Sequence, residues 1–353
     1  MRVLDRYIMT ALGRYIALSM AVLLVLAALF LFVNEQGWVG AGRYGQFQAL
    51  GYVLAQLPAT ALQFLPVAAL LGALLAMGQL ARGSELTVMR AAGIPVARIA
   101  ATVAVAGLLL LPVAVAVGEW LAPQLAQIAR VSRALDRNES LGVAAGSAWL
   151  RDGDLLLRAD AGGGVTIFEL DGERRLAAVT TAGQARPLAE GGWELRDTAQ
   201  TLFATDSVSL GAGGTRRLAT SAGAEILELA GKDPRQLSLT ELRRAIRLFD
   251  AQGQDTRRQR FAFWSGVARL AAIPLAMLLA VPLLFSFLRH AEGGARAALG
   301  LGVGLLYFVA QRMVENGTLA FGLAPLPLAW LPTLLLGFAV ALLLWRTRRI
   351  SAA

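Results

Sequence analysis

Long apolar stretches without a charged side chain dominate this sequence and leave few folds open to it. A helix that crosses a hydrocarbon layer of about 30 Å needs about 20 mostly apolar residues. An interfacial piece up to Leu57 is expected ahead of the second span, because the charge-free window there is too long for one simple crossing. The sequence therefore predicts six transmembrane helices, at about residues 15–34, 58–80, 99–118, 270–287, 297–311 and 328–345.

Charged residues are distributed unevenly along the chain. Residues 134–260 carry 17 Lys or Arg and 18 Asp or Glu, whereas the rest of the chain holds 16 Arg and 6 acidic residues. A basic excess confined to the apolar part indicates charges that flank membrane spans, and it argues against a nucleic-acid-binding face. Alternate connecting segments hold 11 Arg against 2. Because cytoplasmic segments are enriched in Lys and Arg, both termini are predicted to be cytoplasmic, with the polar insert after the third span on the far side.

The polar insert has the pattern of a β domain. Its short strand-like runs are separated by Gly and Asp turn signals about every ten residues, which is typical of an antiparallel sandwich or jelly roll. Downstream of the runs, Ser238-Leu-Thr-Glu241 matches a capping box that opens a helix through about Phe249. The runs are residues 154–159, 165–169, 176–181, 193–197 and 202–210. The predicted organisation is transmembrane helices one to three in residues 1–133, the β domain with its helix in 134–260, and transmembrane helices four to six in 261–353.

The composition excludes several chemistries. The chain has no Cys and one His, His290, so it cannot build a disulfide, a thiol nucleophile or a Cys/His zinc site. Its one Lys, Lys232, does not belong to a G-x-x-x-x-G-K-[ST] loop, so no nucleotide-binding motif of that kind exists. We expect a protein that is not an enzyme and that needs no metal and no cofactor.

The segment between the second and third spans is the most informative one for function. In Arg82-Gly-Ser-Glu-Leu-Thr-Val-Met-Arg-Ala-Ala-Gly-Ile-Pro95, Ser84 is placed to cap a short helix, with Glu85 in its first turn and Gly93 at its end. A short amphipathic helix across the membrane surface is how many transporter permeases contact a motor protein. A connecting loop with ordinary interfacial charges is the alternative interpretation.

These residues resemble a known family. Leu65-Pro-Val-Ala-Ala-Leu-Leu-Gly-Ala-Leu-Leu75 and Ser84-Glu-Leu-Thr-Val-Met-Arg-Ala-Ala-Gly93 are similar to the LptF/LptG family of lipopolysaccharide-export permeases. Val3-Leu-Asp-Arg-Tyr-Ile8 and Gly118-Glu-Trp-Leu-Ala-Pro-Gln124 resemble the LptG branch in particular. The layout of six spans with a β insert after the third matches as well, so the resemblance covers almost the whole chain.

The resemblance implies a membrane α-helical protein with six transmembrane helices and an inserted all-β, jelly-roll-like periplasmic domain. It would be a permease subunit of an ATP-driven ABC-type exporter in the bacterial inner membrane, with both termini cytoplasmic. Its partners would be an LptF-type permease, a homodimer of a cytoplasmic ATPase and a periplasmic bridge of β-jelly-roll proteins. Its cargo would be lipopolysaccharide, extracted from the inner membrane and passed to that bridge.

The resemblance also implies roles for particular residues. In the family, the helix between spans two and three docks into the ATPase, which assigns this role to the segment 84–93, with Glu85 as the charged contact and Met89 as an apolar one. The coupling residues carried over in this way are Ser84, Glu85, Met89, Arg90 and Gly93. A carboxylate that meets an Arg of a partner forms a charge-assisted contact.

By the same resemblance, the substrate lies in a cavity between the two permeases, lined by spans one and five of each. Lipid A carries phosphates, and the planar fork of Arg engages phosphate with two hydrogen bonds. The candidate binders are Arg43, Arg130 and Arg133. Anchoring of a helix end at the interface is the alternative role for each. Some relatives place a Lys near the outer end of span one, but span one of this chain contains none.

Gly300 and Gly304 in span five form a small-xxx-small face that lets another helix approach closely. This face is either a packing surface within the chain or a movable seam against the partner permease.

Other functional classes remain open from the sequence alone. A non-transporting scaffold would use the spans as an anchor and the β domain to bind periplasmic partners, and it would bind no cytoplasmic ATPase. An ion- or solute-coupled carrier usually places ionisable groups in mid-membrane. The only charge clearly within an apolar run is Arg269, close to one end of span four, which disfavours a carrier. The hypothesis of an enzyme that acts on lipids has still less support, because no group of acid and base residues is expected near the membrane surface.

Overall fold

The structure is a computed structural model. It describes residues 3–137, 148–159, 164–171, 175–187, 192–203, 207–211, 213–218, 229, 233–251, 253–286, 293–321 and 324–351. His290 and Lys232 lie outside the described residues. The chain forms two compact units. The membrane unit comprises Met1–Leu31, Leu57–Ala122 and Arg260–Ala353, and the insert unit comprises Phe32–Gln56 and Pro123–Gln259.

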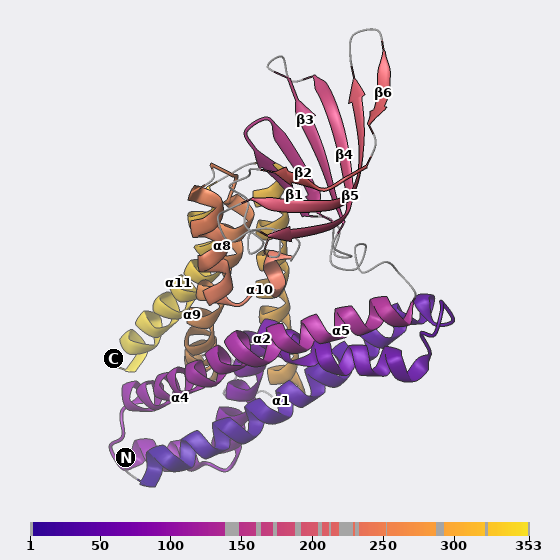
Figure 1. Ribbon diagram of the computed structural model, residues 1–353. Helices are drawn as coiled ribbons and strands as arrows, with labels where there is room; N and C mark the ends of the chain where they lie inside the picture. The colour runs from indigo at the N-terminus through magenta and orange to yellow at the C-terminus, as the bar shows by residue number, and fades with distance from the viewer. Residues whose placement is uncertain are drawn as a thin grey trace. The chain divides into compact units, whose positions relative to one another are not determined.

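Six long apolar helices confirm the predicted membrane spans, and each contains an 18-residue stretch long and apolar enough to cross a membrane (Figure 1). The helix of the third span continues through a π-helical segment, η2 (Val117–Leu121), into α5 (Ala122–Asp136). The six are α1 (Val3–Glu35), α2 (Gln46–Arg82), α4 (Val96–Ala116), α9 (Arg257–Ser286), α10 (Gly293–Phe321) and α11 (Pro325–Ser351).

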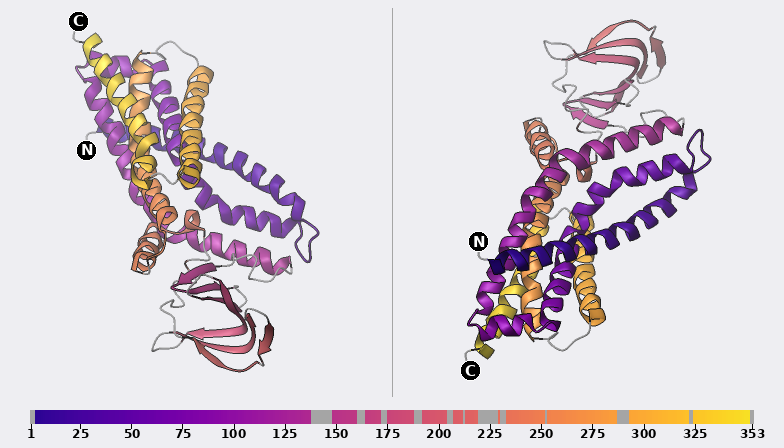
Figure 2. Two further views of the ribbon diagram at one scale, coloured as in Figure 1. Left: turned by 90° about the horizontal axis from the view of Figure 1, so that it is seen from above. Right: turned by 90° about the horizontal axis from the view of Figure 1, so that it is seen from below.

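The predicted interfacial piece before the second span does not form a separate segment. Residues 46–57 and the span are one helix, α2, and Pro58 and Pro66 lie inside it. A proline removes one backbone hydrogen bond and bends a helix, but neighbouring helices compensate for this in membrane proteins. Much of α2 is buried inside the protein, so such neighbours are present. α1 and α2 run antiparallel and are joined at one end by a short loop (Figure 2).

The core of the membrane unit is built around α2. Small side chains on this helix are fully buried and pack with residues of α1 and α9. At Gly72 the helices approach so closely that a Cβ atom would overlap with the backbone of Ile16 on α1. At Gly107 of α4, a Cβ atom would lie 2.7 Å from the Cα atom of Pro274 on α9. Lipid gives helices no hydrophobic reason to associate, so close packing through small residues holds such a bundle together.

The described residues of the insert unit include an antiparallel sheet, which confirms the predicted β domain between spans three and four. Six strands lie side by side in chain order, and β7 pairs with β5 beyond the end of β6. The strands are β1 (Ala148–Asp152), β2 (Leu155–Ala159), β3 (Val165–Leu170), β4 (Leu176–Pro187), β5 (Trp193–Phe203), β6 (Val208–Gly211) and β7 (Arg216–Leu218). β1 and β7 were not predicted, and the predicted run 202–210 covers the end of β5 and most of β6.

The sheet is packed against the helix that follows it, α8 (Leu239–Ala251). Ile167 and Leu195 from the sheet are fully buried with Ala245 and Phe249 of α8. The predicted capping box opens this helix. The Glu241 amide donates to the Ser238 Oγ atom at 3.1 Å, and the Ser238 amide donates to Glu241 Oε2 at 2.9 Å.

We predict that replacing Gly72 with Ala destabilises the helix bundle. The added methyl group meets the backbone of Ile16, which cannot move aside as a flexible side chain can, so the free energy of unfolding should fall by about 1–3 kcal/mol. Thermal unfolding of the purified chain in detergent measures this. Gly51→Ala is the matched control, because Gly51 lies in the same helix and an added methyl group there would have no atom within 4 Å. Equal midpoints for the two variants would contradict the packing described here.

Candidate functional site

The short helix α3 (Glu85–Ala91) connects α2 to α4. Ser84 precedes it as predicted, but its side chain makes no capping hydrogen bond. The physical reason is its backbone, which has a φ of 59° in the left-handed region, whereas a capping residue normally has extended φ and ψ angles. Gly93 ends the helix as predicted, with a φ of 81°. The Ile94 amide then donates to the carbonyl of Met89 at 3.0 Å, which is a common way to close a helix.

α3 has one buried and one exposed face. Leu86 and Met89 are 4% and 8% exposed and belong to the core of the membrane unit. Met89 therefore has little surface left for the apolar partner contact that the resemblance implied. The exposed apolar side chain of this helix is Val88, at 65%. A helical period of 3.6 residues brings Leu86 and Met89 to the same side and leaves Val88 on the other.

A charged residue of α3 also contacts another helix of the membrane unit. The Arg90 guanidinium lies 6.0 Å from the centre of the Phe285 ring. Beyond α3, the Asp5 carboxylate pairs with Arg98 at 3.4 Å and accepts a hydrogen bond from the Thr102 hydroxyl at 3.2 Å. The start of α1 is thus tied to α4.

A second candidate site lies in the insert unit, where the last turn of α1, the start of α2 and α5 meet. We call it the Arg133 cluster, and it consists of Glu35, Trp38, Tyr44, Tyr52 and Arg133. Glu35 Oε1 lies 3.3 Å from an Nη atom of Arg133, and the Tyr44 hydroxyl donates to Glu35 Oε2 at 3.0 Å. The guanidinium carbon lies 4.8 Å from the centre of the Tyr52 ring and 5.8 Å from that of Trp38. This pairing gives a cation both a charged and an aromatic partner.

Two members of the Arg133 cluster are shielded from solvent, whereas Trp38 is 46% exposed. Glu35 is 7% exposed and Tyr44 is 1% exposed. Burial raises the pKa of the Tyr44 hydroxyl above its usual value, and the hydrogen bond to Glu35 is the second cause. Tyr44 therefore stays protonated and donates. The loop before α2 is fixed to the end of α5 by a hydrogen bond from the Arg43 amide to the Asp136 carbonyl, at 2.6 Å.

The three predicted phosphate binders have different surroundings. Arg133 is paired with Glu35, a partner that was not predicted. Arg130, one turn earlier on α5, is half-buried and donates through Nε to the carbonyl of Ala126 at 3.2 Å. The side chain of Arg43 is exposed. One signal for Glu35 was present in the sequence, because no other acidic residue occurs between Asp5 and Glu85.

The predicted glycine face of α10 is directed at α2 of the same chain. A Cβ atom on Gly300 would lie 2.7 Å from Leu74 Cδ1, and one on Gly304 would lie 3.3 Å from the Cβ atom of Val67. Farther along, Phe308 stacks on Phe64 with ring centres 5.3 Å apart. These contacts pack span five within the chain, and a seam against a partner permease remains a prediction.

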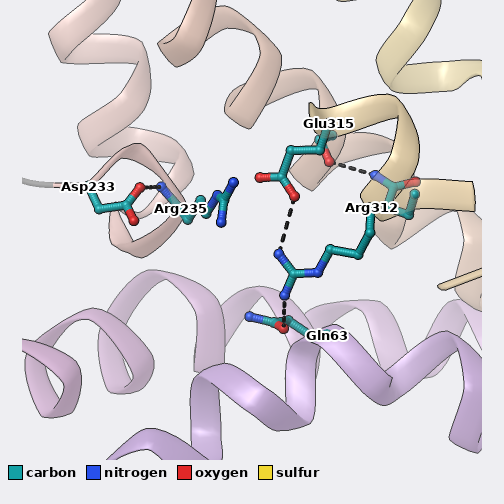
Figure 3. A network of polar contacts seen from close by, with 7 residues as sticks. Gln63, Asp233, Arg235, Arg312 and Glu315 are labelled. Atoms are coloured by element: carbon teal, nitrogen blue, oxygen red, sulfur yellow. Dashed lines mark hydrogen bonds and ion pairs between the residues drawn. The ribbon is translucent and has the colours of Figure 1, made fainter. Parts of the chain in front are cut away.

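A polar contact continues this helix pair beyond the glycines. Arg312 of α10 donates to the side-chain oxygen of Gln63 on α2 at 3.1 Å and pairs with Glu315 at 3.2 Å (Figure 3). Among the residues that the structure describes, no group of three acidic or histidine side chains is arranged to hold a metal ion.

Among the residues that the structure describes, six apolar helices, a short helix between the second and third, and a sheet inserted between the third and fourth define the architecture of a multi-pass membrane protein with an inserted β domain. The family model described as lipopolysaccharide export system permease LptF/LptG matches residues 6–346. The permease protein LptG of Escherichia coli strain K12 is 30% identical over 342 residues, which cover 94% of this chain and 94% of that protein. LptG of Haemophilus influenzae is 30% identical over 357 residues, covering 98% and 99%. The chain belongs to the LptF/LptG family of lipopolysaccharide export permeases.

The raised pKa of Tyr44 predicts a loss of stability at high pH. Above about pH 10 the unfolded chain releases the phenolic proton while the folded chain retains it, so stability falls as the pH rises further. Below that pH the contribution is fully present. We expect the free energy of unfolding of Tyr44→Phe to decline less steeply above about pH 10 than that of the wild type. Chemical unfolding in detergent at a series of pH values measures this, and parallel curves would contradict it.

Proposed function

We propose that this chain is a permease subunit of an ATP-driven exporter that extracts lipopolysaccharide from the bacterial inner membrane and passes it to a periplasmic bridge. The observation that carries the proposal is the family match over residues 6–346, on a chain with six apolar helices and an inserted sheet. The excess of Arg on alternate connecting segments supports cytoplasmic termini and a periplasmic β domain.

The exporter needs further subunits, because this chain has no nucleotide-binding motif. We infer that a homodimeric cytoplasmic ATPase supplies the energy and that an LptF-type permease completes the path for the substrate. Each CH₂ group moved from lipid into water costs about 0.8 kcal/mol, so passive extraction of a lipid with several acyl chains is too slow to be useful. For the next step the β domain would need a continuous apolar groove that shields acyl chains in the periplasm, and we infer that its alternating strands supply it.

In this proposal, α3 receives the motion of the ATPase. The exposed Val88 is the proposed apolar contact and the half-buried Glu85 the charged one, while Leu86 and Met89 attach the helix to the bundle. Because Asp5 joins the start of α1 to Arg98 and Thr102, a movement of α3 and α4 is passed to α1. Span one is also the helix expected to line the substrate cavity.

We propose that the predicted phosphate binders lie at the depth that lipid headgroups occupy. The charge-free part of α1 runs from Tyr15 to Asn34, and 20 helical residues are about 30 Å long, the thickness of the hydrocarbon layer. In this proposal Glu35, which follows that part of α1, and its ion-pair partner Arg133 are near the outer boundary of the layer. Arg130, Arg133 and Arg43 are the side chains that we propose contact the phosphates of lipid A.

We predict that Glu85→Arg impairs coupling between ATP hydrolysis and transport. Reversing the charge replaces an attractive contact with an Arg of the ATPase by a repulsion, so ATP-dependent release of lipopolysaccharide from proteoliposomes should fall about tenfold or more. Val88→Asp should have a similar effect, because it introduces a charge into the apolar part of the contact.

Two control variants separate docking from folding. Asp255→Arg makes the same type of charge change at an exposed position outside α3 and should leave release unchanged. Met89→Leu keeps the buried side of α3 apolar, and release should again be close to that of the wild type. Normal release by Glu85→Arg would exclude the docking role.

The subunit composition tests the proposal as a whole. A tagged chain is purified in mild detergent from its native membrane, and the proteins that accompany it are identified by mass spectrometry. The exporter predicts an ATPase and a second six-span permease in a fixed ratio to the chain. Recovery of the chain alone, or with periplasmic proteins only, would contradict it and favour a non-transporting scaffold.

A further inference from the structure

We propose that Glu35 is a specificity-determining residue, an internal counter-ion of Arg133 that only a multiply charged lipid phosphate displaces. The inference rests on the proposed function, in which Arg133 contacts the phosphates of the exported lipid. Beyond that function, the Glu35 carboxylate of the same chain competes with the lipid phosphate for Arg133. Ordinary phospholipids surround the site in large excess, and Glu35 keeps them from occupying it.

The first observation is the way in which Arg133 is occupied. Arg offers five N–H donors in a rigid fork. The ion pair to Glu35 joins one Nη atom to one carboxylate oxygen at 3.3 Å, which is longer than the 2.7–2.9 Å typical of strong charge-assisted hydrogen bonds. The Nε atom of Arg133 is buried and has no hydrogen-bond partner among the described residues. The fork is thus held by a single, long contact and retains unused donors.

The second observation is that the carboxylate keeps a partner of its own. The Tyr44 hydroxyl donates to the other oxygen of Glu35, and burial keeps this hydroxyl protonated. A carboxylate left in a shielded place without any donor would be very unfavourable. Because Tyr44 remains bound to Glu35, the carboxylate tolerates the loss of Arg133 when a stronger anion arrives.

The aromatic rings beside Arg133 hold its guanidinium in place while a lipid phosphate replaces Glu35. The ring centres of Tyr52 and Trp38 lie 4.8 Å and 5.8 Å from the Arg133 guanidinium carbon. The guanidinium therefore keeps these aromatic contacts whichever anion it binds. The guanidinium carbon of Arg137 lies 3.8 Å from the centre of the Trp38 ring, and this contact restricts the movement of the ring. The anion-binding site is therefore preformed, and the Glu35 carboxylate occupies it in the absence of lipid.

Charge decides which lipid replaces Glu35. A phosphate monoester carries a charge of about −1.5 to −2 at pH 7 and three acceptor oxygens, enough for the Nε and Nη atoms together. The phosphodiester of an ordinary phospholipid carries one negative charge, the same as Glu35, so the exchange gives no electrostatic gain. Specificity that arises from opposing the wrong ligand is common in binding sites. The site should therefore accept phosphate-monoester glycolipids and reject phosphodiester lipids.

The test compares two lipids on the full-length chain, purified with its partners in nanodiscs. The probes are lipopolysaccharide with a phosphorylated lipid A and phosphatidylglycerol, an anionic phosphodiester lipid, and affinities are measured by competition against labelled lipopolysaccharide. In Glu35→Gln the competing charge is gone. Phosphatidylglycerol should then bind about tenfold more tightly, in line with the loss of a hydrogen-bonded charge. The affinity for lipopolysaccharide should change much less, so the ratio of the affinity for lipopolysaccharide to that for phosphatidylglycerol falls.

A second variant keeps the test valid if Glu35→Gln does not fold. Tyr44→Phe leaves the charge of Glu35 in place but removes its hydrogen-bond donor, so the carboxylate depends more on Arg133 and resists displacement. This variant should bind both lipids more weakly than the wild type. Glu35→Asp keeps the charge and should retain a selectivity close to that of the wild type. An unchanged ratio in Glu35→Gln, or unchanged lipid binding in Tyr44→Phe if Glu35→Gln does not fold, would overturn the inference.

One further variant distinguishes this inference from the proposed function. Arg133→Gln should weaken lipopolysaccharide binding if Arg133 contacts the phosphate at all. If Arg133→Gln has no effect, the proposed substrate contact itself is wrong. If Arg133→Gln weakens binding but Glu35→Gln leaves the selectivity unchanged, the substrate contact stands and only the role of Glu35 falls.

Discussion

Close contact between helix backbones is the constraint on which the membrane unit depends. Lipid surrounds the spans, so burial of apolar side chains against one another gains little over contact with acyl chains. Stability then has to come from dense packing, and the glycines and alanines of α2 allow it. Gly72 admits the backbone of Ile16, and the glycines of α10 admit the side chains of Leu74 and Val67. At each of these positions a side chain in place of the glycine would overlap with the facing helix, so the close approach depends on the glycine.

The proposed role of the short helix α3 depends on its attachment to this packed bundle. A surface helix transmits force only if it is anchored on its inner side, and Leu86 and Met89 provide this anchor. The ion pair between Asp5 and Arg98 connects the start of α1 with the same region. The polar and apolar residues of this segment therefore act together, with the exposed ones available to a partner and the buried ones joined to the bundle.

The Arg133 cluster shows how a cation is kept available in a shielded place. An unpaired guanidinium there would be strongly disfavoured, and a permanent bidentate carboxylate would be too strong to displace. One long contact to Glu35, together with two aromatic rings, lies between these extremes. The structural role of these contacts in holding α1, α2 and α5 together does not conflict with the proposed role in ligand selection, because both would use the same contacts.

The sequence by itself determined the number and positions of the spans, the inserted sheet, the capping box at Ser238 and Glu241, and the end of α3 at Gly93. These features depend on local patterns, namely apolar length, strand alternation, and residues with special backbone or capping chemistry. Only the tertiary structure decided that α2 continues through its prolines, that Ser84 adopts a left-handed backbone without a side-chain cap, that Met89 faces the core, and that Glu35 pairs with Arg133. Each of these depends on which residues distant in the chain become neighbours. Glu35 and Arg133 are 98 positions apart, and no local pattern reports such a pair.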